Sequence, residues 1–257
     1  MLPLILFAFG AIVGSFLNVC ILRLPKEESV VFPGSHCMAC GKPVAWRDNV
    51  PLVSFFVLKG KCRSCGRRIS RQYFVVELAT ALLFAGFFYF FTPPAKAAVY
   101  LAMTLALLVE SVIDWRHKII PDEITFPGIL FGIVASAFFP VIHGEFFWAR
   151  GFAQALIGAA LGAGLLIAVG TLAELVMKKE AMGGGDVKLL AMIGAVVGWQ
   201  GVLWTVFVSS LVGTGVGLYL RVKKGEAAIP FGPFLAIGAF LYLFFGKEVI
   251  AWYLGIL

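Results

Sequence analysis

Charged residues are scarce in this sequence. They make up 14% of the 257 residues, while hydrophobic residues make up 61%, against about 25% and 45–50% in a typical soluble domain. This composition excludes an ordinary soluble globular protein and predicts a protein of the lipid bilayer. The first apolar stretch, residues 2–22, also lacks a preceding basic region and a small-residue cleavage site. That lack excludes a secretory signal peptide and predicts a retained membrane span.

Eight stretches are apolar enough to be candidates for crossing about 30 Å of hydrocarbon. They are residues 2–22, 73–91, 97–113, 124–142, 152–173, 187–199, 201–220 and 229–245. The sixth is short and contains Lys188, so hydropathy alone also allows a re-entrant segment joined to the seventh. We expect an all-α polytopic bundle of about eight transmembrane helices.

Positive charge is distributed unequally between the loops. With eight crossings, 18 of the 21 Lys and Arg residues lie on one side of the membrane, and the positive-inside rule places that side in the cytoplasm. The net charge of +7 then reports orientation, and we expect no nucleic-acid partner. Residues 23–72, a long polar segment, carry ten of these basic residues. We therefore divide the chain into a first helix (1–22), a cytoplasmic insert (23–72) and a seven-helix membrane domain (73–257).

Four of the five cysteines form two C-x-x-C pairs in the insert. The pairs are Cys37 with Cys40 and Cys62 with Cys65, separated by 21 residues, a spacing at which two knuckles close on one tetrahedral metal ion. A glycine follows each pair and allows the tight turn that a knuckle needs. We predict a structural zinc site, because four thiolates leave no open position for a substrate.

Other interpretations of the cysteines are two disulfides, free thiols or an iron site. A cytoplasmic location argues against disulfides, because thiols stay reduced there. His36 adjoins the first pair, but four thiolates already satisfy the metal. Cys20, in the first span, is interpreted as a small buried apolar residue.

Carboxylates at membrane depth are costly, so each is by default a candidate for a functional site. The candidates are Glu77, Glu110, Asp114, Glu174 and Asp186. Asp114 ends the third span, and Asp186 follows three glycines at the start of the sixth. In the eight-span topology both lie at cytoplasmic helix ends and can meet. Glu110 is four residues from Asp114 on the same helix face, so one interpretation is that it perturbs the proton affinity of Asp114. The favoured interpretation is that Glu77 and Glu110 are buried, protonated groups hydrogen-bonded between helices.

Two carboxyl groups within hydrogen-bond reach share one proton near neutral pH, which is the state that an aspartic peptidase requires. The glycines before Asp186 would let an extended substrate backbone approach closely. A structural interpretation stays open for Asp186, as the N-cap of its helix after a glycine hinge. Asp122, which follows Pro121, is expected to be the N-cap of the fourth span.

The chain resembles the type IV prepilin peptidase family, the prepilin leader peptidase and N-methyltransferase enzymes. The resemblance extends over nearly the whole chain and rests on an ordered set of strings. These are Gly14–Cys20 followed by Arg23–Pro25, the two cysteine pairs, Ile69–Ser70 with Tyr73 and Val76–Glu77, Asp114 with Ile120–Asp122, Gly183–Asp186, and Pro230–Phe234.

The resemblance implies that Asp114 and Asp186 are the catalytic pair of an intramembrane aspartic peptidase in the bacterial inner membrane. It implies that the substrates are type IV prepilins or type II secretion pseudopilins, cut on the cytoplasmic side after a short basic leader. It also implies N-methylation of the new amino terminus with S-adenosylmethionine. The sequence has no glycine-rich fingerprint for that donor, so no residues are assigned to its binding.

Two functions of other classes compete with the peptidase. One is a transporter with a structural zinc domain, in which Asp114 and Asp186 relay protons. Transporters usually have paired broken helices in related halves, and only one segment here is interrupted by glycines. The other is a non-catalytic assembly platform that binds pilins, which would not need both aspartates.

Overall fold

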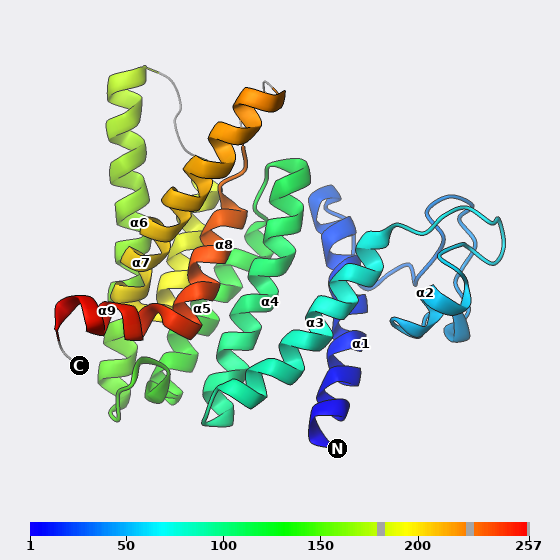
Figure 1. Ribbon diagram of the computed structural model, residues 1–257, viewed down its shortest axis with the longest axis horizontal. Helices are drawn as coiled ribbons and strands as arrows, with labels where there is room; N and C mark the ends of the chain where they lie inside the picture. The colour runs from blue at the N-terminus through cyan, green and yellow to red at the C-terminus, as the bar shows by residue number, and fades with distance from the viewer. Residues whose placement is uncertain (179–182, 225–228, 256–257) are drawn as a thin grey trace. The chain divides into compact units, whose positions relative to one another are not determined.

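The computed structural model describes residues 1–178, 183–224 and 229–255 (Figure 1). Within these ranges the regular structure is helical, apart from two isolated β-bridges. The chain forms two compact units, Met1–Ala97 and Ala98–Leu257. The predicted all-α membrane architecture with a small cysteine-containing insert is therefore confirmed. The division into 1–22, 23–72 and 73–257 stays a prediction.

Unit 1 consists of two long helices and the insert between them. Helix α1 spans Leu2–Arg23, and α3 spans Arg71–Phe90. A Cβ atom on Gly10 would lie 2.8 Å from Cα of Ala81, and one on Gly14 would lie 2.7 Å from Cα of Glu77. Glycines at one-turn spacing on α1 thus allow the two backbones to approach closely, as is common between helices in membranes.

The insert contains little regular structure. It has the short helices η1 (Leu24–Lys26), η2 (Trp46–Asp48) and α2 (Val53–Val57). The rings of Phe55 and Phe56 each lie 5.2 Å from the ring of Phe74 on α3. These aromatic contacts fix α2 against the beginning of α3, because paired rings add stabilisation beyond the apolar area that they bury.

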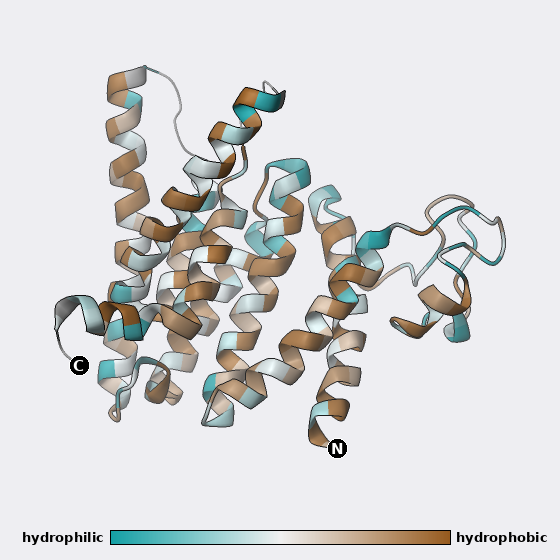
Figure 2. Cartoon of the chain, viewed as in Figure 1, coloured by the Kyte–Doolittle hydropathy of each residue, from teal (hydrophilic) through white to brown (hydrophobic). Residues whose placement is uncertain are grey.

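Unit 2 contains the remaining long helices. They are α4 (Pro94–His117, from Ala98 on), α5 (Asp122–Phe138), α6 (Trp148–Met177), α7 (Gly184–Lys224), α8 (Gly232–Leu241) and α9 (Lys247–Leu254), with the short elements η3 (Pro140–His143) and η4 (Tyr242–Gly246). Apolar residues cover most of the lengths of these helices (Figure 2). Many large apolar side chains are exposed, such as Leu172, Phe207 and Leu211, which is typical of lipid-facing surfaces.

Helix α7 is broken at Gly198, where φ is 75° and ψ is −179°. This backbone conformation favours glycine, and it reverses the chain. In the first segment of α7, Leu189 lies close to Gly232 at the start of α8, and Val197 lies beside Gly201, which is close to Tyr242 just after α8. In the second segment, Gly213 lies close to Phe234, near the start of α8. The first segment of α7 therefore runs in the same direction as α8, and the second segment runs opposite to both (Figure 1).

Six helices are long and apolar enough to cross a membrane, judged over the described ranges: residues 2–26, 71–90, 94–117, 148–176, 184–223 and 232–253. The expected number was about eight. The difference has two sources, because α5 has only 17 residues and the two predicted spans 187–199 and 201–220 are the two segments of α7. The chain is a multi-pass membrane protein.

Two expectations about helix ends are wrong. Pro121, not Asp122, is the N-cap of α5, and the carboxylate of Asp122 forms an ion pair with Lys188 instead of capping the helix. Helix α5 ends at Phe138 rather than 142 because Phe139, which precedes Pro140, leaves the helical region at φ −125° and ψ 67°. A residue before proline is disfavoured in the helical conformation.

Close packing of α6 on α7 yields a prediction about stability. A Cβ atom on Gly158 would overlap the Gly194 carbonyl group, whereas Gly164 on the same helix has open space around it. We expect Gly158→Ala to lower the free energy of unfolding by about 1–3 kcal/mol, as overpacking does. Gly164→Ala should leave the melting temperature in detergent unchanged or higher, because alanine favours helix. Equal melting temperatures for the two variants would contradict this packing.

Candidate active site and metal site

Four cysteine sulfurs converge in the insert. The Sγ atoms of Cys37, Cys40, Cys62 and Cys65 all lie within 4.8 Å of one another, and those of Cys37 and Cys65 are 3.9 Å apart. A tetrahedral ion bound at 2.3 Å would hold its sulfurs about 3.8 Å apart. The predicted convergence of the two pairs is confirmed, and the arrangement is compatible with a metal site.

Both cysteine pairs have the same backbone geometry. Gly41 and Gly66 each have a φ of 68°, and their N–H groups donate to the carbonyls of Cys37 and Cys62 at 2.8 and 2.9 Å. The N–H groups of the same two cysteines donate to the carbonyls of Lys42 and Arg67 at 2.9 Å. The glycines after each pair are therefore required by the turn, as expected for knuckles.

The surroundings of Cys37 favour a thiolate. Backbone N–H groups of Ala39 and Cys40 donate to its sulfur and lower the pKa of the thiol to about 6. A deprotonated sulfur is the form that binds metal. His36 lies outside the cluster, with its Nδ1 atom 3.0 Å from the Gly34 carbonyl oxygen.

Asp114 lies near the end of α4 and is 5% exposed. Its Oδ2 atom accepts a hydrogen bond of 2.9 Å from the N–H group of Gly232, at the start of α8. The first N–H groups of a helix have no partner within it, so a carboxylate there stabilises the helix end. A Cβ atom on residue 232 would lie 2.6 Å from this oxygen, which explains why glycine occupies the position.

Asp186 lies in the first turn of α7, and Leu189, about one turn further along, lies beside Gly232, as Asp114 does. The ends of α4, α7 and α8 that carry the two aspartates and Gly232 lie at the same end of unit 2 (Figure 1). Within the described part of the chain, Oδ1 of Asp186 is buried and has no hydrogen-bond partner. One carboxylate is thus fixed by a backbone donor, and the other has a buried oxygen without a hydrogen-bond partner among the described residues.

Glycines 183 and 184 precede Asp186 and are exposed, and Gly184 has open space where a side chain would be. Gly185 has a packing role instead, because a Cβ atom there would lie 3.0 Å from Cβ of Ile120. The backbone before Asp186 is therefore accessible, in agreement with the expectation that an extended chain could approach it.

The other acidic candidates have different surroundings. Glu77 is hydrogen-bonded to Ser15 on α1, as expected for a group between helices, and it also accepts a hydrogen bond from the Leu52 N–H group. Glu110 is buried, as expected, but the hydrogen bond expected for it is not found, because both of its carboxylate oxygens lack a partner among the described residues. Glu174 is exposed.

Sequence reasoning gave no role to Gly232 or Leu52. Gly232 belongs to the Pro230–Phe234 string, but nothing in that string indicates a hydrogen bond to a residue 118 positions away. Leu52 follows a proline in the insert and has no local pattern that marks it as a donor to Glu77.

Comparison with known proteins gives matches over nearly the whole chain. Residues 8–91 match the family model described as Bacterial Peptidase A24 N-terminal domain, and residues 101–218 match Type IV leader peptidase family. Similar proteins named prepilin leader peptidase/N-methyltransferase occur in Pseudomonas aeruginosa (39% identical, covering 95% of this chain and 91% of the relative), Stutzerimonas stutzeri (37%, 95% and 91%) and Pseudomonas putida (36%, 94% and 90%). No solved structure matches the chain.

The sulfur cluster predicts a selective loss of metal. We expect the purified protein to contain about one metal ion per chain, and Cys62→Ser to lower that content, because a site with four sulfur ligands loses one of them. Cys20→Ser is the matched control, since Cys20 lies on α1 outside the cluster. Elemental analysis of the two variants checks this, and equal metal content in both would contradict it.

Proposed function

Because the chain belongs to the type IV leader peptidase family, we propose that it removes the leader from type IV prepilins or type II secretion pseudopilins and N-methylates the new amino terminus. Asp114 and Asp186 form the catalytic pair. The observation that supports the hydrolytic half is that Asp114 of α4 and Leu189, one turn after Asp186 on α7, both lie against Gly232. In addition, Oδ1 of Asp186 is buried without a hydrogen-bond partner among the described residues.

Hydrolysis by this pair needs no covalent intermediate. The ionised carboxylate takes a proton from a water molecule as the water oxygen attacks the scissile carbonyl carbon. The protonated carboxyl group donates its proton to the carbonyl oxygen. When the tetrahedral intermediate breaks down, the C–N bond cleaves and the leaving amine receives a proton from one carboxyl group. One hydroxyl group of the intermediate returns its proton to the other carboxylate as the C=O bond forms again, so the pair ends with a single proton. The hydrogen bond from Gly232 holds Asp114 in place during these steps.

The location proposed for the enzyme is the bacterial inner membrane. The insert and the two aspartates are assigned to the cytoplasmic side, because the excess of Lys and Arg predicted for that side follows the positive-inside rule. An apolar pilin helix can then remain in the bilayer while its scissile bond, preceded by a basic leader, reaches the membrane boundary. The four cysteines hold zinc, which stabilises the insert and takes no part in cleavage.

Substitution of either aspartate tests the catalytic pair. We expect Asp114→Asn and Asp186→Asn each to lower leader removal by about 10²–10⁴-fold, the range for loss of a general acid or base. Asparagine retains an oxygen that can accept the Gly232 hydrogen bond, so insertion and accumulation should be normal. Cleavage of a co-expressed prepilin is the measurement, and Glu174→Gln, at an exposed carboxylate, is the control. Normal processing by either asparagine variant would eliminate this mechanism.

The contact between Gly232 and Asp114 predicts a second effect. Gly232→Ala should displace the Asp114 carboxylate and lower the cleavage rate by about 10²-fold, the usual consequence of misplacing a catalytic group by about 1 Å. Gly215→Ala on α7 is the matched control, since it has open space for a Cβ atom. If Gly232→Ala cleaved prepilin at the wild-type rate, the held position of Asp114 would be irrelevant to catalysis.

A further inference from the structure

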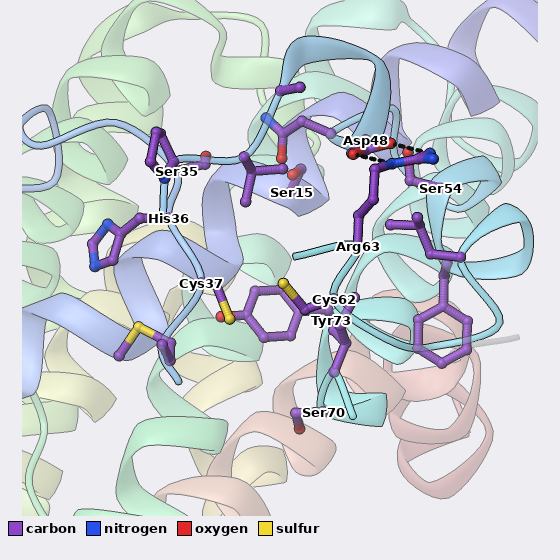
Figure 3. A pocket seen from close by; sticks show the side chains of 18 of the residues that line it. Ser15, Ser35, His36, Cys37, Asp48, Ser54, Cys62, Arg63, Ser70 and Tyr73 are labelled. Carbon is purple, nitrogen blue, oxygen red and sulfur yellow. Dashed lines mark hydrogen bonds and ion pairs between the residues drawn. The ribbon is translucent and has the colours of Figure 1, made fainter. Parts of the chain in front are cut away.

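Unit 1 contains a cavity of about 820 Å³ between α1, the insert and the start of α3. Its volume falls within the range of about 300–1,000 Å³ that is usual for small-molecule sites. The side chains of Cys37, Cys62 and Tyr73 lie together at the cavity, with Ser15 and the Asp48–Arg63 ion pair also on its lining (Figure 3). A second cavity, in unit 2, is smaller, at about 310 Å³, and is mostly apolar.

Glu77 is the buried carboxylate of this cavity, with an exposed fraction of 8%. The other two acidic side chains on the lining differ from it. Glu28 is exposed, and Asp48 forms a two-point hydrogen-bonded ion pair with Arg63 at 2.7 and 2.8 Å. Among the described residues, the hydrogen-bond donors of Glu77 are neutral: Ser15 and the Leu52 N–H group. A buried carboxylate whose described partners are neutral can receive a cation or a proton from a ligand.

The hydrogen bond that orients Glu77 comes from a residue with a strained backbone conformation. Leu52 has φ 62° and ψ −52°, and the N–H group of Val53 donates to the carbonyl of Pro51 at 2.7 Å. This is the γ-turn with a positive φ, which is rare and strained for a residue other than glycine. The turn directs the Leu52 N–H group to Oε2 of Glu77 at 2.7 Å. Such strain is found where function requires a particular geometry.

The cavity combines the surfaces that an adenosyl sulfonium compound needs. Aromatic side chains on its lining, among them Tyr73 and Phe74, offer flat apolar contacts. The exposed guanidinium groups of Arg47 and Arg67 can pair with the carboxylate of the amino-acid portion. Arg23, in contrast, already donates to the carbonyls of Ser29 and Pro33.

We propose that this cavity is the methyl-transfer site, where it binds the sulfonium methyl donor, and that Glu77 is the base that takes a proton from the acceptor amine. The proposal rests on the methyltransferase half of the proposed function and assigns it to unit 1. The cleaved substrate then presents its new amino terminus to a site distinct from the pair that produced it.

The step balances with one proton moved to the carboxylate. A terminal ammonium group gives a proton to Glu77 and becomes a neutral amine. The nitrogen lone pair forms the N–CH₃ bond as the C–S bond breaks, and the bonding electrons remain on sulfur. The products are a protonated N-methylamine, a neutral thioether and a protonated Glu77. An α-amino group has a pKa of about 7.7–8.0. Most substrate molecules therefore carry a protonated amino terminus at pH 7 and must lose a proton before methyl transfer.

Glu77→Gln tests the base while preserving the fold. The glutamine oxygen can still accept the hydrogen bond from Leu52, so metal content and leader removal should stay at wild-type values. Methylation of a cleaved prepilin should fall by about 10²-fold or more at pH 7. The defect should shrink as the pH rises to 9, because the amine then loses its proton without help. The control is Glu27→Gln, at an exposed carboxylate outside the cavity lining.

The location of the site has a readout other than activity. Radiolabelled S-adenosylmethionine is cross-linked to the full-length protein by ultraviolet light, and the protein is then cleaved at methionine with cyanogen bromide. Because methionines occur at positions 38 and 103, label from the cavity should appear in residues 2–38 or 39–103. An excess of unlabelled S-adenosylhomocysteine should prevent this labelling by competing for the same site.

The outcomes separate this inference from the proposed peptidase. Label found only beyond Met103 would overturn the location of the site. Methylation by Glu77→Gln at the wild-type rate at pH 7 would overturn the role of Glu77 as the base. In both cases, leader removal by the same preparation would show that the peptidase activity is intact. A wild-type protein that cleaves prepilin but neither cross-links the donor nor methylates would overturn both the inference and the methyltransferase half of the proposed function. Loss of cleavage in the wild type would reject the peptidase itself.

Discussion

The position of Asp114 in unit 2 depends on one hydrogen bond, from the N–H group of Gly232 to its carboxylate. Gly232 and Asp114 are both buried, so a protein group must satisfy the free N–H group at this helix end. Here a side chain from α4 satisfies the start of α8. The same contact holds the buried Asp114 carboxylate in place. One interaction thus satisfies a helix end and positions a carboxylate of the proposed catalytic pair.

Unit 1 also contains a hydrogen bond between a carboxylate and a distant backbone N–H group. Glu77 on α3 accepts the N–H group of Leu52, so a carboxylate again holds a distant backbone segment. In this case the segment is the insert, and the contact fixes its loop beside the first turns of α3. The two knuckles and the Asp48–Arg63 ion pair organise the rest of the insert. Asp48, Arg63 and Glu77, which make these contacts, all line the cavity of unit 1.

The sequence reveals local features well and distant contacts poorly. The cysteine cluster could be predicted because its spacing and the two following glycines lie within 30 residues. Hydropathy placed a boundary between spans at 199–201, close to the observed break at Gly198, because both segments are apolar on either side of a polar interruption. It could not give the length of α5, which the conformation of Phe139 before Pro140 decides. The hydrogen-bond donors to Asp114 and Glu77 could not be predicted either, because both are backbone N–H groups and every residue except proline has one.

The two proposed reactions place opposite demands on a carboxyl group. Hydrolysis needs two acids close enough to share a proton, and α4 and α7 supply Asp114 and Asp186 at one end of unit 2. Methyl transfer needs one carboxylate that accepts a single proton, and a second acid beside it would compete for that proton. Glu77, which accepts a hydrogen bond from a backbone N–H group, meets this condition and belongs to unit 1, whereas both aspartates belong to unit 2. The two proposed reactions therefore use different carboxyl groups, so each reaction can be lost without the other.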